Sequence, residues 1–115
     1  MTKRQKQRIE QQLQAKALDL QEELARLRDK LTLEPGGDSA DYQRAVADRG
    51  STILAVNRGM ELMSRVASAL AALESGSYGM CAQCEEPIGE KRLRAVPWAT
   101  LCVQCRSKIE DGRAA

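Results

Sequence analysis

Four cysteines, arranged as two Cys-x-x-Cys pairs with seventeen residues between them, constrain this chain more than any other feature. The pairs are Cys81–Cys84 and Cys102–Cys105. A two-residue gap lets both sulfurs of a pair face one metal ion from a tight turn, and two such pairs are typical of a tetrahedral four-thiolate zinc site. Such a site is closed to substrates, so we expect one structural Zn²⁺. The alternatives are two disulfides, four free thiols, or a thioredoxin-like redox pair, which lacks its usual strand and helix pattern here.

The rest of the composition favours long helices. The 115 residues include no Phe, one Trp and two Tyr, and good helix formers such as Leu, Ala, Gln, Glu, Arg and Lys dominate. With 18 basic and 16 acidic residues the net charge is only +2, which argues against a dedicated nucleic-acid binder. No signal peptide is visible, and the uncharged run Val66–Leu73 is too short to span a membrane. We therefore expect a cytoplasmic protein without a membrane segment, in which reduced cysteines favour metal over disulfides.

Two long amphipathic helices are predicted before the cysteines. In the first, about Lys3 to Leu33, the apolar seam consists of Ile9, Leu13, Ala17, Leu20, Leu24, Leu27 and Leu31. Glu34-Pro35-Gly36-Gly37 then ends the helix, because proline restricts the residue before it and glycine permits left-handed backbone. The second helix runs from Asp38 or Ser39 to about Glu74. Its predicted seam is Val46, Ile53, Val56, Met60, Met63, Ala67 and Leu70, and Gly50 interrupts it.

A short connection makes two long helices antiparallel neighbours. Facing residues should have numbers that add to about 73, as Leu20 and Ile53 do. Because this pairing satisfies the seam within one chain, we expect a monomer. The fold class is all-α: a coiled-coil hairpin over residues 1–75 with its tip near 34–41, then a four-cysteine zinc module over 76–115 with a short C-terminal helix, Arg106 to about Asp111. The module should cover the apolar end of the second helix around Val66, Leu70 and Leu73.

The residues around the cysteines resemble the DksA/TraR family of bacterial transcription factors. The similarity is carried by Tyr78-Gly79-Met80-Cys81-Ala82-Gln83-Cys84, Ile88-Gly89, Arg92-Leu93, Ala95, Pro97, Ala99, Leu101-Cys102 and Cys105. It covers the whole zinc module, and the hairpin before it agrees in architecture. The resemblance implies a protein that binds RNA polymerase without reading DNA, inserts its hairpin into the secondary channel and changes initiation there, together with the alarmone ppGpp.

The resemblance also implies roles for single residues. The family's Asp-x-x-Asp-x-Ala tip motif corresponds to Asp38 and Asp41 here, with Gln43 in place of the alanine. Arg65 and Arg106 occupy positions comparable to the family's basic ppGpp contacts, whereas Val96 carries no charge at a third such position.

Other interpretations of the same residues stay open. Asp38 and Asp41 suit an N-cap and the first turn of a helix, which would explain both without a partner. The other functions considered are a nucleic-acid-binding zinc finger and a structural coiled-coil adaptor. An enzyme is the least favoured, because the chain has no His and no nucleophile paired with a base.

Overall fold

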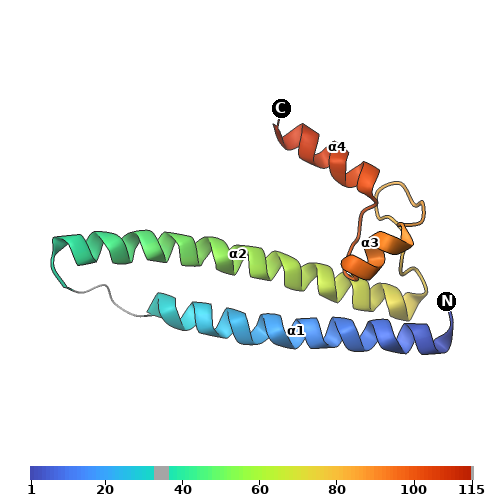
Figure 1. Ribbon diagram of the computed structural model, residues 1–115, viewed down its shortest axis with the longest axis horizontal. Coiled ribbons are helices and arrows are strands. Elements are labelled where there is room, and N and C mark those ends of the chain that lie inside the picture. Colours follow the sequence, from blue (N-terminus) through green and yellow to red (C-terminus); the bar gives the residue numbers. More distant parts are fainter. Residues whose placement is uncertain (33–36, 115) are drawn as a thin grey trace. The chain divides into compact units, whose positions relative to one another are not determined.

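The computed structural model describes residues 1–32 and 37–114 and is all-α, as predicted. Its helices are α1 (Lys3–Thr32), α2 (Ser39–Ser75), α3 (Glu90–Ala95) and α4 (Val103–Ala114) (Figure 1). No strand forms among these residues, apart from an isolated antiparallel bridge between Met80 and Pro87. In the part of the chain that the structure describes, no helix is long and apolar enough to cross a bilayer.

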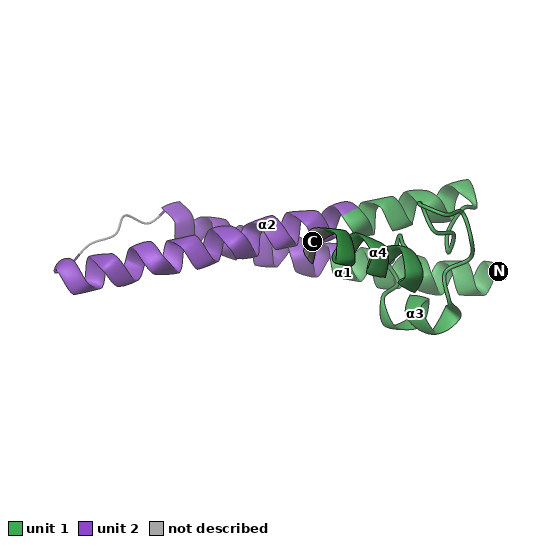
Figure 2. Cartoon of the chain, turned by 90° about the horizontal axis from the view of Figure 1, so that it is seen from above, with its two compact units in different colours: residues 1–16, 65–115 green, residues 17–64 purple. Residues whose placement is uncertain are grey.

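The chain divides into two compact units, shown by colour in Figure 2. Unit 1 contains residues 1–16 and 65–115, and unit 2 contains residues 17–64. Both long helices run through both units without a break. The boundary expected between residues 75 and 76 coincides with the end of α2 and stays a prediction, as does the Glu34-Pro35-Gly36 turn, which lies outside the described residues.

Short capping motifs begin and end the long helices. Before α1, Thr2 Oγ1 accepts the backbone N–H of Gln5 at 3.1 Å, and Gln5 Oε1 accepts that of Thr2 at 2.8 Å, which is a capping box. At the end of α2, Gly76 has a φ of +83° and the Ser77 N–H donates to the Ala72 carbonyl at 2.9 Å. These are the features of a Schellman motif, and they confirm the predicted helix end.

The predicted seam of α1 is confirmed. Leu13, Leu20 and Leu24 are buried, and the other predicted seam residues, Ile9, Ala17, Leu27 and Leu31, are half-buried. In unit 1 the predicted burial at the end of α2 is found at Val66 and Leu73, which are buried, and at Leu70, which is half-buried, whereas Ala67 of the predicted seam is exposed. The 3.6-residue period therefore identifies the inner face of α1 correctly.

The predicted seam of α2 is partly wrong in unit 2. Val56 is buried as expected, but Val46, Ile53 and Met60 are 47%, 44% and 50% exposed. Val56 and Met63 of the predicted seam do lie on the inner face, but its other residues are mostly small or polar: Ala45, Arg49, Thr52, Ala55, Gly59 and Leu62. The prediction assigned the large apolar side chains to the seam. The small side chains of α2 are the ones that allow the two helix backbones to approach each other.

The pairing of the two helices is shifted accordingly. A Cβ atom on Gly59 would lie 2.8 Å from Leu24 Cδ2, and Arg49 Nη2 donates to the Leu31 carbonyl at 3.3 Å. The numbers of the facing residues therefore add to 83 for Leu24 and Gly59 and to 80 for Leu31 and Arg49, not to the expected 73. The expected sum of 73 assumed that both helices end at equal distances from the centre of the turn. This assumption is wrong, because residues 39–48 of α2 extend past the end of α1 (Figure 1). Arg49 places its charge at the α1 C-terminus, where the helix dipole favours a cation.

Candidate metal centre

The four cysteine sulfurs form one cluster in unit 1. Their Sγ atoms all lie within 4.8 Å of one another, and Cys84 Sγ is 3.8 Å from Cys102 Sγ. Four thiolates placed tetrahedrally about 2.3 Å from Zn²⁺ are about 3.8 Å apart, so the cluster has the size that zinc requires. All four thiols are free, and a disulfide would need sulfurs about 2.05 Å apart.

A tight loop presents the first pair. The Cys81 N–H donates to the Glu86 carbonyl at 2.8 Å, and the Glu85 N–H donates to the Cys81 carbonyl at 3.0 Å. The bridge between Met80 and Pro87 closes this loop. Glu85 adopts a left-handed conformation with φ of 62°, which is uncommon for a residue with a side chain. The turn that directs both sulfurs toward one point therefore includes one residue in an energetically less favourable backbone conformation.

The second pair opens a helix. Cys102 immediately precedes α4, and the Cys105 N–H donates to Cys102 Sγ at 3.4 Å, so the sulfur acts as an N-cap. This corrects the expected start of the C-terminal helix at Arg106, because α4 already begins at Val103 and includes Cys105. A thiolate at this position is favoured by the helix N-terminus.

Backbone and apolar contacts join the two pairs. The Ala82 N–H donates to the Thr100 carbonyl at 2.8 Å, and Arg92 Nε on α3 donates to the Leu101 carbonyl at 3.1 Å. The module's small core contains Cys81, Ile88 and Cys105, with Leu93, Ala99, Leu101 and Cys102 packed against it. The sequence did not predict α3, because its six residues are too few for a periodic signal.

The electrostatics of the cluster suit a metal that replaces protons. Backbone hydrogen bonds, first from Cys84 and then from Cys102, lower the pKa of the Cys81 thiol to about 6. Hydrogen bonding with the Cys102 side chain, together with burial, raises the pKa of the Cys105 thiol to about 12. Four adjacent thiols cannot all ionise without a cation between them. A bound Zn²⁺ would supply that charge and stabilise the fold, while leaving no coordination position open.

The two aspartates of the predicted tip lie at the start of α2. Asp38 Oδ1 accepts the Asp41 N–H at 3.0 Å, so Asp38 is an N-cap, as the simpler interpretation predicts. Gly37 has a φ of +98°, a conformation that favours glycine, and a Cβ there would make a tight contact of 3.0 Å with Asp41 Oδ2. Asp38 and Asp41 are both exposed, and Tyr42 beside them is 53% exposed.

Arg65 and Arg106 line one groove of unit 1. The groove has a volume of about 430 Å³, and its other lining residues are Arg92, Val96, Trp98, Val103, Ser107 and Glu110. Arg106 Nε donates to Glu110 Oε1 at 3.0 Å, a pair on the helix surface. The Trp98 ring has Lys16 Nζ 5.2 Å from its centre. The structure thus brings the two predicted arginines together and adds Arg92 and Trp98, which sequence reasoning did not connect with them.

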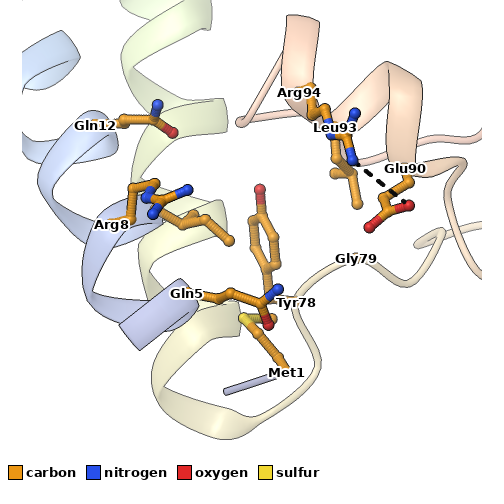
Figure 3. A pocket seen from close by; sticks show the side chains of 10 residues that line it. Met1, Gln5, Arg8, Gln12, Tyr78, Gly79, Glu90, Leu93 and Arg94 are labelled. Carbon is orange, nitrogen blue, oxygen red and sulfur yellow. Dashed lines mark ion pairs between the residues drawn. The ribbon is translucent and has the colours of Figure 1, made fainter. Parts of the chain in front are cut away.

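A larger groove of about 580 Å³ lies between the start of α1 and α3 (Figure 3). The Tyr78 ring stands at its centre, and the Tyr78 hydroxyl donates to the Pro97 carbonyl at 2.8 Å. Burial raises the pKa of Tyr78, so this hydroxyl stays protonated. On the rim, Glu90 and Arg94 form an exposed ion pair at 3.9 Å.

Comparison with known proteins agrees with this geometry. Residues 76–111 match the family model described as the prokaryotic dksA/traR C4-type zinc finger. The chain is 38% identical to the RNA polymerase-binding transcription factor DksA of Caulobacter vibrioides, over 67% of this chain and 54% of that protein. It is 32% identical to general stress protein 16O of Bacillus subtilis, over 88% of this chain and 68% of that protein. The prediction of one structural zinc is confirmed by the family match and the sulfur cluster.

A solved structure matches the whole fold. Transcription factor DksA2 from Pseudomonas aeruginosa aligns with a TM-score of 0.76 at 28% identity, covering 100% of this chain and 90% of that one. The chain spans about half the length of the Caulobacter relative that it matches.

Proposed function

The chain belongs to the DksA/TraR family, and on that premise we propose that it is a bacterial transcription regulator that binds RNA polymerase. One observation carries the proposal: the zinc module and the two-helix hairpin occur together in a fold that aligns from end to end with a transcription factor of this family. The family match and the names of its relatives indicate a regulatory activity and not an enzymatic one. Its place of action is the cytoplasm, with polymerase.

The finer part of the proposal is that the hairpin acts in the polymerase secondary channel through Asp38 and Asp41. Both acids are exposed at the first turn of α2, and Gly37 leaves room for the Asp41 carboxylate. Capping does not compete with this role, because an N-cap carboxylate that accepts one N–H still presents negative charge outward. Two carboxylates change the electric field around them without requiring a large contact area. Gln43 stands in place of the family's alanine two residues after Asp41.

An in vitro transcription assay tests the tip. The double variant Asp38→Asn/Asp41→Asn should still bind polymerase but lose most of its effect on initiation, since asparagine caps as well as aspartate. The matched control is Asp48→Asn, which removes another exposed acid of α2 ten residues beyond Asp38. The control should keep full activity. Unchanged activity in the double variant would leave the two acids as helix caps and refute the proposed tip mechanism.

We further propose that the groove with Arg65 and Arg106 binds ppGpp or an acidic polymerase surface. Three arginines and Trp98 line it, and its volume of about 430 Å³ is in the range of small-molecule sites. A phosphate would replace Glu110 as the partner of Arg106. Arg106→Ala should abolish any ppGpp-dependent part of the transcriptional effect, whereas Lys108→Ala, on the same helix but outside the groove, should not. A ppGpp response that survives Arg106→Ala excludes this site.

Two other functions predict different results. A nucleic-acid-binding zinc finger should bind DNA with an affinity that falls steeply with salt, because phosphate contacts release counterions. A structural adaptor should not bind polymerase at all. The near-neutral net charge argues against a nucleic-acid-binding zinc finger, and the family match argues against both alternative functions.

A further inference from the structure

The first ten residues of α2 extend beyond the end of α1, within unit 2 (purple in Figure 2). Arg49 faces Leu31, the penultimate residue of α1, so residues 39–48 lie past the point where the two helices meet. Ala45 is half-buried, and every other residue between 39 and 48 is exposed. At about 1.5 Å per residue this segment is roughly 15 Å long. We call residues 39–48 the overhang.

Local hydrogen bonds fix the two tip acids to the overhang. Asp38 Oδ1 accepts the Asp41 N–H at 3.0 Å, and the Asp38 carbonyl accepts the Tyr42 N–H at 2.8 Å. Asp38 and Asp41 therefore move together with the overhang. Their position relative to the rest of the hairpin depends on the direction in which α2 leaves the end of α1. A bend of about 20° at the start of the overhang would move them by roughly 5 Å.

The helix is most deformable where the overhang begins. Gly50 and Ser51 follow Arg49, and Gly–Ser pairs are among the few places where helices kink sharply. A Cβ on Gly50 would meet nothing within 4 Å, so packing does not require the glycine. Thr52 Oγ1 donates to the Asp48 carbonyl at 2.9 Å across this pair, a back-bond that often bends helices. Even so, α2 continues through the pair without a break.

Arg49 ties α2 to α1 directly beside this deformable pair. Its Nη2 donates to the Leu31 carbonyl at 3.3 Å, and both residues are half-buried. The Leu31 carbonyl belongs to the last turn of α1, where no N–H of the same helix remains to donate to it. The positive charge of the guanidinium is also favoured at a helix C-terminus. The bond therefore connects the two helices one residue before Gly50.

We propose that Gly50–Ser51 is a hinge for the overhang and that Arg49 is the positioning residue that holds this hinge. The inference rests on the proposed action of Asp38 and Asp41 in the polymerase channel. Arg49 lies about 12 Å along the helix from Asp41, so it acts by directing the acids and not by adding to their charge. Its loss should reduce the effect on initiation and leave the affinity for polymerase unchanged.

In vitro transcription and binding to core RNA polymerase, both with the zinc-loaded full chain, test the proposal. In Arg49→Ala the effect on initiation should fall by about fivefold or more, because activity depends steeply on position, while the dissociation constant changes by less than about twofold. Gly50→Ala stiffens the hinge, so Arg49→Ala/Gly50→Ala should recover at least about half of the lost effect. Arg49→Lys, which keeps a cationic donor without the guanidinium geometry, should lie between Arg49→Ala and the unchanged chain.

Three comparisons separate positioning from charge and from stability. Arg44→Ala removes an exposed cation that lies closer to Asp41 and should keep its activity. Leu24→Ala removes buried apolar contacts and should also keep its activity, measured where circular dichroism shows that it is folded. In the Asp38→Asn/Asp41→Asn background Arg49→Ala should cause no further loss, because it acts through the two acids.

Several results would overturn the proposal. Unchanged initiation in Arg49→Ala, or a loss that Gly50→Ala does not restore, would refute the hinge. An equal loss in Arg44→Ala or Leu24→Ala would reduce Arg49 to a charge or a contribution to stability, and a parallel loss of polymerase affinity would make it a contact. Full activity in the double asparagine variant would refute the proposed tip function. Loss of activity in that variant but not in Arg49→Ala would refute this inference alone.

Discussion

Gly50→Ala and Gly59→Ala make the same chemical change in the same helix, and the structure predicts opposite outcomes. An alanine at an interior helix position is favoured over glycine by about 1 kcal/mol. A Cβ on Gly50 meets nothing within 4 Å, so this variant should gain the full amount. A Cβ on Gly59 lies 2.8 Å from Cδ2 and 3.4 Å from Cγ of Leu24, which is 7% exposed.

The contact with Leu24 determines the size of the effect. Inserting a methyl group into a packed seam costs about 1–3 kcal/mol, which cancels or exceeds the propensity gain. Gly59→Ala should therefore be neutral or destabilising by up to about 2 kcal/mol, and the two variants should differ by about 1–3 kcal/mol. Leu24→Ala alone should cost about 2–5 kcal/mol and less in the Gly59→Ala background, because the new methyl group partly fills the cavity.

Urea denaturation of the zinc-loaded protein, followed by helical circular dichroism, measures the free energies of unfolding of the unchanged chain and of the four variants. The expected coupling between positions 24 and 59 is at least about 0.5 kcal/mol. If facing numbers added to 73, Gly59 would oppose the exposed Gln14 and both alanines would stabilise equally. Equal stabilisation by the two variants, with no coupling to Leu24, would refute the register.

Three further expectations concern the metal and the cap. Cys84→Ser should lose zinc, measured by elemental analysis, while the helical signal largely remains because unit 2 has its own seam. Zinc should bind more weakly as pH falls, since the ligands must be thiolates and protons compete with the metal for all four of them; a zinc-sensitive dye reports the release. Asp38→Ala should remove about 1 kcal/mol of capping and speed hydrogen exchange at the Asp41 amide, whereas Asp38→Asn should change little.

The parts of the fold with strong local signals could be predicted from sequence. The cysteine spacing identified the metal ligands, because few arrangements other than a four-thiolate site need that pattern. The leucine seam of α1 was correct because its large apolar residues are also the buried ones. The second helix ended close to the expected Glu74, through the left-handed conformation of Gly76.

The register of the hairpin could not be predicted in the same way. In α2 the inner face uses Thr52 and Gly59, whose small size permits close approach, while the larger Ile53 stays outside. Hydrophobicity alone therefore selects the wrong face. The contact between Arg49 and the Leu31 carbonyl depends on how far α2 extends past α1, which no local pattern encodes. The basic groove likewise needs tertiary structure, because it collects Arg65, Arg92 and Arg106 from three helices.

Direct binding to core RNA polymerase tests the central claim. Zinc-loaded chain, labelled at its N-terminus, is titrated with core enzyme in the absence of DNA, and anisotropy reports the complex. We expect saturable binding that is retained in Asp38→Asn/Asp41→Asn and competed by unlabelled chain, with no comparable binding to DNA alone. No binding to core polymerase, or binding only to DNA with a steep salt dependence, would contradict the account.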